Sequence, residues 1–188
     1  MTKSRIEAFS DGVIAILITI MVLELKPPHE PSFHALCEQY PLYLSYVLSF
    51  ANIGIYWNNH HHLFHGVKHI SGAVMWANLH LLFWLSLISV ATAWAGETHF
   101  ASTPVAVYGI VLVGCAFAYT ILQAMLVNAN GKDSDFARAL GKDFKGKISL
   151  VIYLVSIPLA WVLPILSCLC FLAVAIIWFV PDKRFEGA

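Results

Sequence analysis

An uncharged segment near the start of the chain constrains its fold most strongly. Between Asp11 and Glu24 lie twelve residues that carry no formal charge and only one hydroxyl. A helix from Arg5 to Leu25 would be about 30 Å long, which is roughly the thickness of the hydrocarbon core of a bilayer. The segment therefore predicts a membrane-spanning helix with Arg5 and Asp11 at its leading end. Because an ionised side chain in lipid costs about 3 kcal/mol or more unless it is partnered, we expect both to contact another helix or another subunit.

One face of this helix carries a regular pattern. Gly12, Ile16, Thr19 and Leu23 are separated by four, three and four residues, which places them on one narrow stripe with Ile20 beside it. The pattern has two interpretations. The stripe is either a packing seam against a neighbouring helix or the lining of a pore.

The composition is that of an integral membrane protein. Of the 188 residues, 59% are hydrophobic and 12% are charged, whereas soluble proteins average about 45 to 50% and about 25%. Eleven basic residues balance eleven acidic ones, so there is no basic field to attract nucleic acid. The sequence also lacks the motifs of serine hydrolases, zinc proteases, P-loop proteins and dinucleotide-binding enzymes. We therefore predict a protein that is not an enzyme, with no catalytic residues, no cofactor and no nucleic-acid partner.

We predict an all-α protein of one domain, residues 1–188, with six membrane-spanning helices. The apolar segments lie at about 5–25, 42–64, 71–94, 104–127, 148–162 and 163–180. The last two provide only about 33 residues together, whereas two full crossings need about 40. A re-entrant pair is therefore the alternative for these two segments.

The basic residues support six spans and predict the orientation of the chain. With the N-terminus in the cytoplasm, ten of the eleven basic residues lie on the cytoplasmic side, as the positive-inside rule requires. Lys26 alone lies outside. Lys183 and Arg184 place the C-terminus in the cytoplasm as well, so we expect a multi-pass protein with both ends inside.

Histidines cluster at the end of the second span. His61, His65 and His69 follow spacings of four, so two or three imidazoles on one helix face could meet a metal such as zinc. No Cys or carboxylate lies nearby in the sequence to complete a site, and polar packing at the helix end is the favoured interpretation. We predict no metal site.

Two polar residues lie inside the third span. If Asn78 and His80 are buried there, they need hydrogen-bond partners from other helices. Arg5, Ser10 and Asp11 lie at the same cytoplasmic end. We expect an interhelical network that fixes the first helix in place, and a proton relay is the alternative.

The opening motif suggests a family. It is Arg5-x-x-x-Phe9-Ser10-Asp11, which resembles the signature of the lysosomal and prokaryotic potassium channels called transmembrane protein 175. Two further segments are similar to that family: Tyr56-Trp57-x-x-His60-His61-x-Leu63-Phe64 at the end of the second span and Asn78-Leu79-x-Leu81-Leu82-Phe83 in the third. The resemblance covers the first half of the chain in detail and the second half only in architecture.

The resemblance implies a potassium channel of the prokaryotic cell membrane that lacks a TVGYG filter loop. Four copies of the six-span chain would surround a central pore lined by the first helix of each copy. Ile16 would form the tightest ring, and Ile20 and Leu23 would form further rings toward the outside. The hydroxyls of Thr19 would give modest selectivity for potassium. The expected partners are potassium ions, the lipid bilayer and other copies of the chain.

The resemblance further implies that the opening motif holds the first helix against the second and third spans. The residues of this network would be Arg5, Phe9, Ser10, Asp11, Trp76 and His80. Two other functions remain open on the residues themselves. A proton-coupled secondary transporter would use Asp11 and His80, whereas a non-conducting membrane scaffold would use the stripe only for packing.

Overall fold

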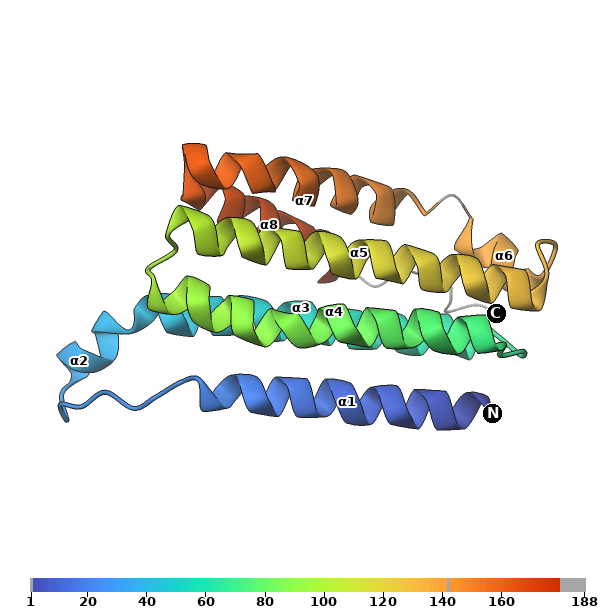
Figure 1. The fold of residues 1–188 in the computed structure, drawn as a ribbon, viewed down its shortest axis with the longest axis horizontal. Coiled ribbons are helices and arrows are strands. Elements are labelled where there is room, and N and C mark those ends of the chain that lie inside the picture. The colour runs from blue at the N-terminus through green and yellow to red at the C-terminus, as the bar shows by residue number, and fades with distance from the viewer. Residues whose placement is uncertain (1, 142, 180–188) are drawn as a thin grey trace.

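The computed structural model describes residues 2–141 and 143–179, and these residues form eight helices (Figure 1). Their bounds are α1 Lys3–Leu23, α2 Phe33–Glu38, α3 Tyr40–His65, α4 Gly72–Glu97, α5 Ser102–Asn130, α6 Asp135–Leu140, α7 Phe144–Val162 and α8 Pro164–Phe179. The predicted all-α class is therefore confirmed. The short helix α2 lies in the connection between the first two apolar segments.

Four of the described helices, α1, α4, α5 and α7, are long and apolar enough to cross a membrane, so the chain is a membrane protein. α3 has 26 residues, but the amides and histidines of its second half lower its hydropathy, and α8 has only 16. Each of the six predicted segments coincides with a helix, and four of the six meet both criteria for a span. Val180, Lys183 and Arg184, on which the predicted sixth span and the orientation partly depended, lie outside the described residues.

The long helices lie side by side in a bundle whose centre is formed by α4 and α5 (Figure 1). α4 packs against α1, α3 and α5, and α5 packs against α7 and α8. α1 lies at one edge of the bundle, where its main contacts are with α3 and α4. A large part of the surface of α1 is therefore left uncovered by the rest of the chain.

Capping residues explain where several helices begin and end. Ser71, Ser134 and Asp143 precede α4, α6 and α7, and each side chain accepts a hydrogen bond from the backbone N–H three residues later. Gly131 and Gly141 follow α5 and α6 with φ values of 98° and 57°. Glycine adopts these values without the steric cost that a side chain would add.

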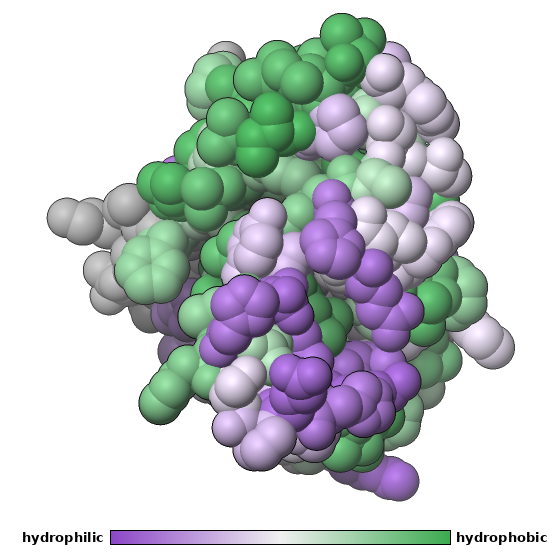
Figure 2. Space-filling model, turned by 90° about the vertical axis from the view of Figure 1, so that its left-hand side faces the viewer, coloured by the Kyte–Doolittle hydropathy of each residue, from purple (hydrophilic) through white to green (hydrophobic). Residues whose placement is uncertain are grey.

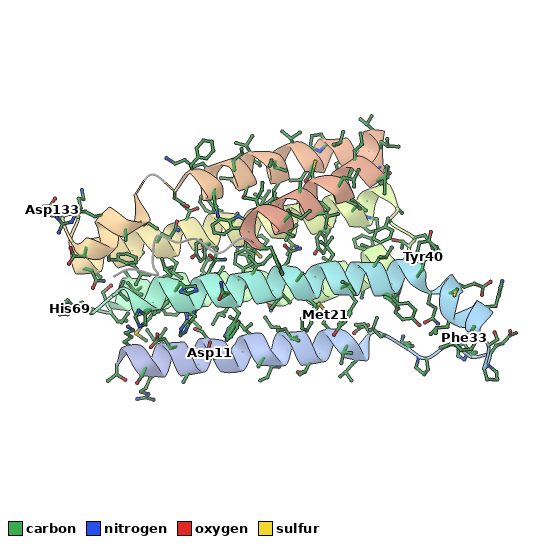
Figure 3. All side chains as sticks on the ribbon, turned by 180° about the vertical axis from the view of Figure 1, so that it is seen from behind. Asp11, Met21, Phe33, Tyr40, His69 and Asp133 are labelled. Carbon is green, nitrogen blue, oxygen red and sulfur yellow. The ribbon has the colours of Figure 1, made fainter. Side chains whose placement is uncertain are left out.

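The polar connections gather at the two ends of the bundle. The N-terminus and the loops that contain His69 and Asp133 lie at one end, and α2 and Tyr40 lie at the other (Figures 1 and 3). Figure 2 looks onto the end that carries α2 and shows hydrophilic residues gathered there beside a hydrophobic flank. This distribution fits a bundle whose sides face lipid and whose ends face water.

Candidate functional site on the first helix

α1 has one buried face and one exposed face. The buried face packs toward α3 and α4 and consists of Ile6, Ser10, Ile14, Leu17 and Met21. The predicted stripe of Gly12, Ile16, Thr19 and Leu23 lies on the exposed face, together with Ile20. Ile16 is 55% exposed and Leu23 is 73% exposed. The stripe is therefore not a packing seam against another described helix of this chain.

The stripe presents branched apolar side chains with one polar atom among them. The Thr19 hydroxyl donates to the carbonyl oxygen of Ile16 at 2.9 Å, so its proton is used within the helix. The remaining lone pair of the Thr19 oxygen stays available on the exposed face. From Gly12 to Leu23 the stripe is about 16 Å long, long enough to line a substantial part of a membrane.

Three buried polar side chains join the other face of α1 to α3 and α4. The Asn78 amide nitrogen donates to the Ser10 hydroxyl oxygen at 2.9 Å, and the Asn78 carbonyl oxygen lies 2.7 Å from His60 Nε2. None of the three residues is more than 2% exposed. We call Ser10, Asn78 and His60 the buried anchor. It supplies the interhelical bond that the sequence suggested between Ser10 and Asn78.

A second connection to α3 lies nearer the surface. The indole nitrogen of Trp57 donates to the Asp11 carboxylate at 3.0 Å, and Figure 3 shows Asp11 on the side of α1 that faces α3. The Lys3 ammonium donates to the backbone carbonyl of His65 at 3.1 Å. Asp11 therefore has a partner on another helix, as its position in the sequence indicated.

Other residues expected in the network have different positions. His80 accepts a hydrogen bond from the Trp84 indole at 3.0 Å, within α4 itself. Trp76 is 75% exposed and Phe9 is 51% exposed, and the Arg5 side chain is exposed as well. His80 is two positions after Asn78 and so points about 200° away around the helix. His60 of α3 therefore occupies the place in the anchor that we expected of His80.

Trp57 and His60 are the two residues of α3 that bind the α1 side of the network and that sequence reasoning did not assign. They are three residues apart, so they lie on the same face of α3. Both belong to the segment of the second span that resembles the potassium-channel family. That segment was the available signal, because composition and spacing alone gave His60 no role.

The histidine cluster does not form one helix face. α3 ends at His65, so His69 lies beyond the helix, where the backbone N–H groups of Lys68 and His69 donate to the Asn130 side-chain oxygen at 2.9 Å. The rings of His61 and His65 are 6.4 Å apart. Within residues 2–141 and 143–179, no three His, Cys, Asp or Glu side chains are placed to hold a metal.

These features define an all-helical membrane protein whose first helix is fixed along one face and uncovered along the other. Comparison with known proteins identifies the class more closely. Residues 5–88 match the family model described as the endosomal/lysosomal potassium channel TMEM175. The chain is 51% identical to a potassium channel of Chryseobacterium sp. (strain P1-3), over 99% of this chain and 97% of that protein.

Two further similarities agree with this match. The crystal structure of a lysosomal potassium-selective channel TMEM175 homolog from Chamaesiphon minutus is similar with a TM-score of 0.86 and 29% identity, covering 96% of this chain and 98% of that chain. An endosomal/lysosomal proton channel TMEM175 of Gallus gallus is 42% identical over 34% of this chain and 15% of that protein. The chain belongs to the TMEM175 family, which is a family of ion channels and not of enzymes.

Proposed function

We propose that this chain is the subunit of a homotetrameric, potassium-permeable channel of the cell membrane, in which α1 of each copy lines a central pore. One observation carries the proposal: Ile16, Thr19 and Leu23 occupy the face of α1 that no other described helix of the chain covers. The names of the bacterial relatives as potassium channels support the permeant ion. One helix cannot enclose a path by itself, so the pore requires several copies.

The proposed constriction follows from the shape of the exposed side chains. Four copies of Ile16 form the narrowest ring, with rings of Ile20 and Leu23 beyond it. Apolar rings of this kind close a path by contact or by dewetting, and a small rotation of α1 opens it. The oxygens of four Thr19 side chains replace part of the hydration shell of potassium, which gives modest selectivity because no cage of backbone carbonyls is involved.

The buried anchor gives α1 a defined orientation in this proposal. Ser10 is held by Asn78, and Asp11 is held by Trp57, so the leading turns of the helix cannot rotate freely. The N-terminus and the loops that contain His69 and Asp133 share one end of the bundle. That arrangement supports six crossings with both termini in the cytoplasm, because the basic residues Lys68 and Lys132 then lie inside.

Proton permeation is the second candidate, because relatives such as that of Gallus gallus are named proton channels. A coupled transporter that uses Asp11 and His80 gains no support from the geometry. Asp11 is bonded to Trp57 and His80 is bonded to Trp84, and neither bond joins one residue to the other. Proton flux is therefore best tested as a property of the same α1 path.

Potassium flux into liposomes that contain the purified protein tests the proposal. We expect flux in the wild type and a several-fold increase for Ile16→Asn, because a polar ring holds water where an apolar ring excludes it. Val151→Asn on α7 is the matched control, since Val151 is 58% exposed and Ile16 is 55% exposed. Absence of potassium flux from folded protein, or equal effects of the two substitutions, would contradict the proposal.

A further inference from the structure

The loop between α3 and α4, residues 66–71, joins the two helix ends that hold α1. Trp57 and His60 lie near the end of α3, and Asn78 lies near the start of α4. These three side chains belong to the hydrogen bonds that connect α1 to the rest of the bundle. A change in the conformation of the loop would therefore shift the residues that hold α1.

α1 depends on these bonds for its orientation. Among the described residues, its side chains bond to other helices only through Lys3, Ser10 and Asp11, all in its leading half. Beyond Asp11, the buried side chains of α1 are all apolar. Apolar contacts are not directional, so they fix the rotation of a helix less strictly than hydrogen bonds do. The helix ends beside the loop therefore set the orientation of α1.

One side chain of α5 binds this loop. Asn130 is the last residue of α5, and its side-chain oxygen accepts from the backbone N–H groups of Lys68 and His69, each at 2.9 Å. Its amide nitrogen donates to the carbonyl oxygens of His69 at 3.0 Å and Leu126 at 2.9 Å. An asparagine amide has two N–H donors and an oxygen with two lone pairs. The four bonds therefore use its full capacity and fix its orientation.

Asn130 connects the loop to a helix on which α1 does not mainly pack. α1 packs on α3 and α4, whereas α5 packs on α4, α7 and α8. Figures 1 and 3 show the start of α1, the end of α5 and the loop that contains His69 at the same end of the bundle. The loop itself is seated by Val67, whose side chain is 2% exposed. Any effect of Asn130 on α1 is therefore transmitted through the loop.

We propose that Asn130 is a positioning residue of the channel, which fixes the orientation of α1 through the α3–α4 loop. This inference rests on the proposed function, in which α1 lines the pore and a ring of Ile16 side chains closes it. The bonds of Asn130 stabilise the helix ends in the arrangement that holds this ring closed. Without these bonds α1 rotates more easily, so the open state gains population.

Single-channel recording of the full-length protein in planar bilayers tests this role. We expect Asn130→Ala to raise the open probability at least threefold. The unitary conductance should stay unchanged, because Asn130 does not line the path. Thr120→Val is the matched control, since the Thr120 hydroxyl donates to the carbonyl oxygen of Ala116 at 2.9 Å within α5 itself. That variant removes a hydrogen bond of the same helix without touching the loop, and it should keep the wild-type open probability.

Three results would overturn the positioning role. The first is an open probability that Asn130→Ala leaves unchanged, and the second is an equal rise in Thr120→Val. The third is a changed unitary conductance in Asn130→Ala, which would place its effect in the path itself. Circular dichroism checks that both variants are folded. If Asn130→Ala does not fold, Asn130→Ser takes its place, because a serine hydroxyl has one donor where the amide has two.

A nitroxide label on α1 separates this inference from the channel proposal. The label is attached at Ser4→Cys, an exposed position in the first turn of α1. The background is Cys37→Ser, because Cys37 is the exposed free cysteine among the described residues. The electron paramagnetic resonance spectrum should show a more mobile label in Asn130→Ala than in Thr120→Val. Equal mobility would overturn the inference even if the protein conducts. If no variant conducts potassium, the channel proposal fails, while the label still decides whether Asn130 positions α1.

Discussion

Asn78 holds the centre of the anchor because its carboxamide both donates and accepts. The nitrogen serves Ser10 on α1, and the oxygen serves His60 on α3. Since all three residues are almost fully buried, water cannot replace a lost partner. Trp57 and Asp11 make a bond of similar length at an exposed position, where water can take over. The two connections should therefore differ in their contribution to stability.

Replacing Asn78 tests this difference. Asn78→Ala leaves Ser10 and His60 without partners, and we expect a loss of about 1 to 3 kcal/mol in the free energy of unfolding. Trp57→Phe removes only the exposed bond and should cost less than about 1 kcal/mol. Denaturant titration of both variants in detergent measures the difference. Equal stabilities of the two variants would contradict the assigned role of the buried anchor.

A second pair of substitutions concerns the hydroxyls between α3 and α4. Ser89 Oγ is buried without a hydrogen-bond partner among the described residues, whereas Thr92 Oγ1 lies 2.6 Å from Ser49 Oγ and 2.6 Å from the carbonyl oxygen of Ile88. We expect Ser89→Ala to keep or raise the melting temperature, because it removes an unsatisfied polar group. Thr92→Val should lower the melting temperature. The account is wrong here if Ser89→Ala proves the more destabilising of the two.

At the scale of the helices, close approach of α4 and α5 organises the bundle. Gly114 of α5 lies directly against the indole of Trp84 of α4, so a Cβ atom at position 114 would collide with the ring. The same indole donates to His80. A change at Gly114 should therefore disturb both the helix contact and the side-chain pair on α4.

Alanine substitutions at two glycines test this contact. Gly114→Ala should destabilise the protein by about 1 to 3 kcal/mol, as added atoms do in a packed core. Gly54→Ala in α3 is the control, because nothing lies within 4 Å of a Cβ built there, and it should cause no loss since alanine favours helix. Thermal unfolding of both variants gives the comparison. A tolerated Gly114→Ala would show that α4 and α5 are farther apart than described.

The helices could be predicted from the sequence because long apolar segments leave few other structures in a membrane. The predicted segment 71–94 corresponds to α4 Gly72–Glu97, and the predicted segment 104–127 corresponds to α5 Ser102–Asn130. The direction in which each face points could not be predicted, because a helix that is apolar on all sides has no periodicity to mark its buried face. This is why the stripe of α1 had two interpretations and why His80 was expected where His60 lies.

At the scale of the whole molecule, the edge position of α1 is the feature that matters most for function. α1 contacts α3 and α4 on one side and exposes Ile16, Ile20 and Leu23 on the other. In a symmetric assembly, a helix at the edge of each copy can meet its equivalents around a common axis. If α1 instead faced lipid, its position 16 would have no reason to lie near position 16 of another copy.

Disulfide formation at position 16 tests this claim most directly. Ile16→Cys is made in a Cys37→Ser background, because Cys37 is the exposed free cysteine among the described residues, and the full-length protein is oxidised in nanodiscs. The account predicts rapid disulfide-linked pairs at position 16 within a particle of four chains, with no such link for Val151→Cys on α7. A monomeric particle, or a position 16 that fails to link while position 151 links readily, would contradict it.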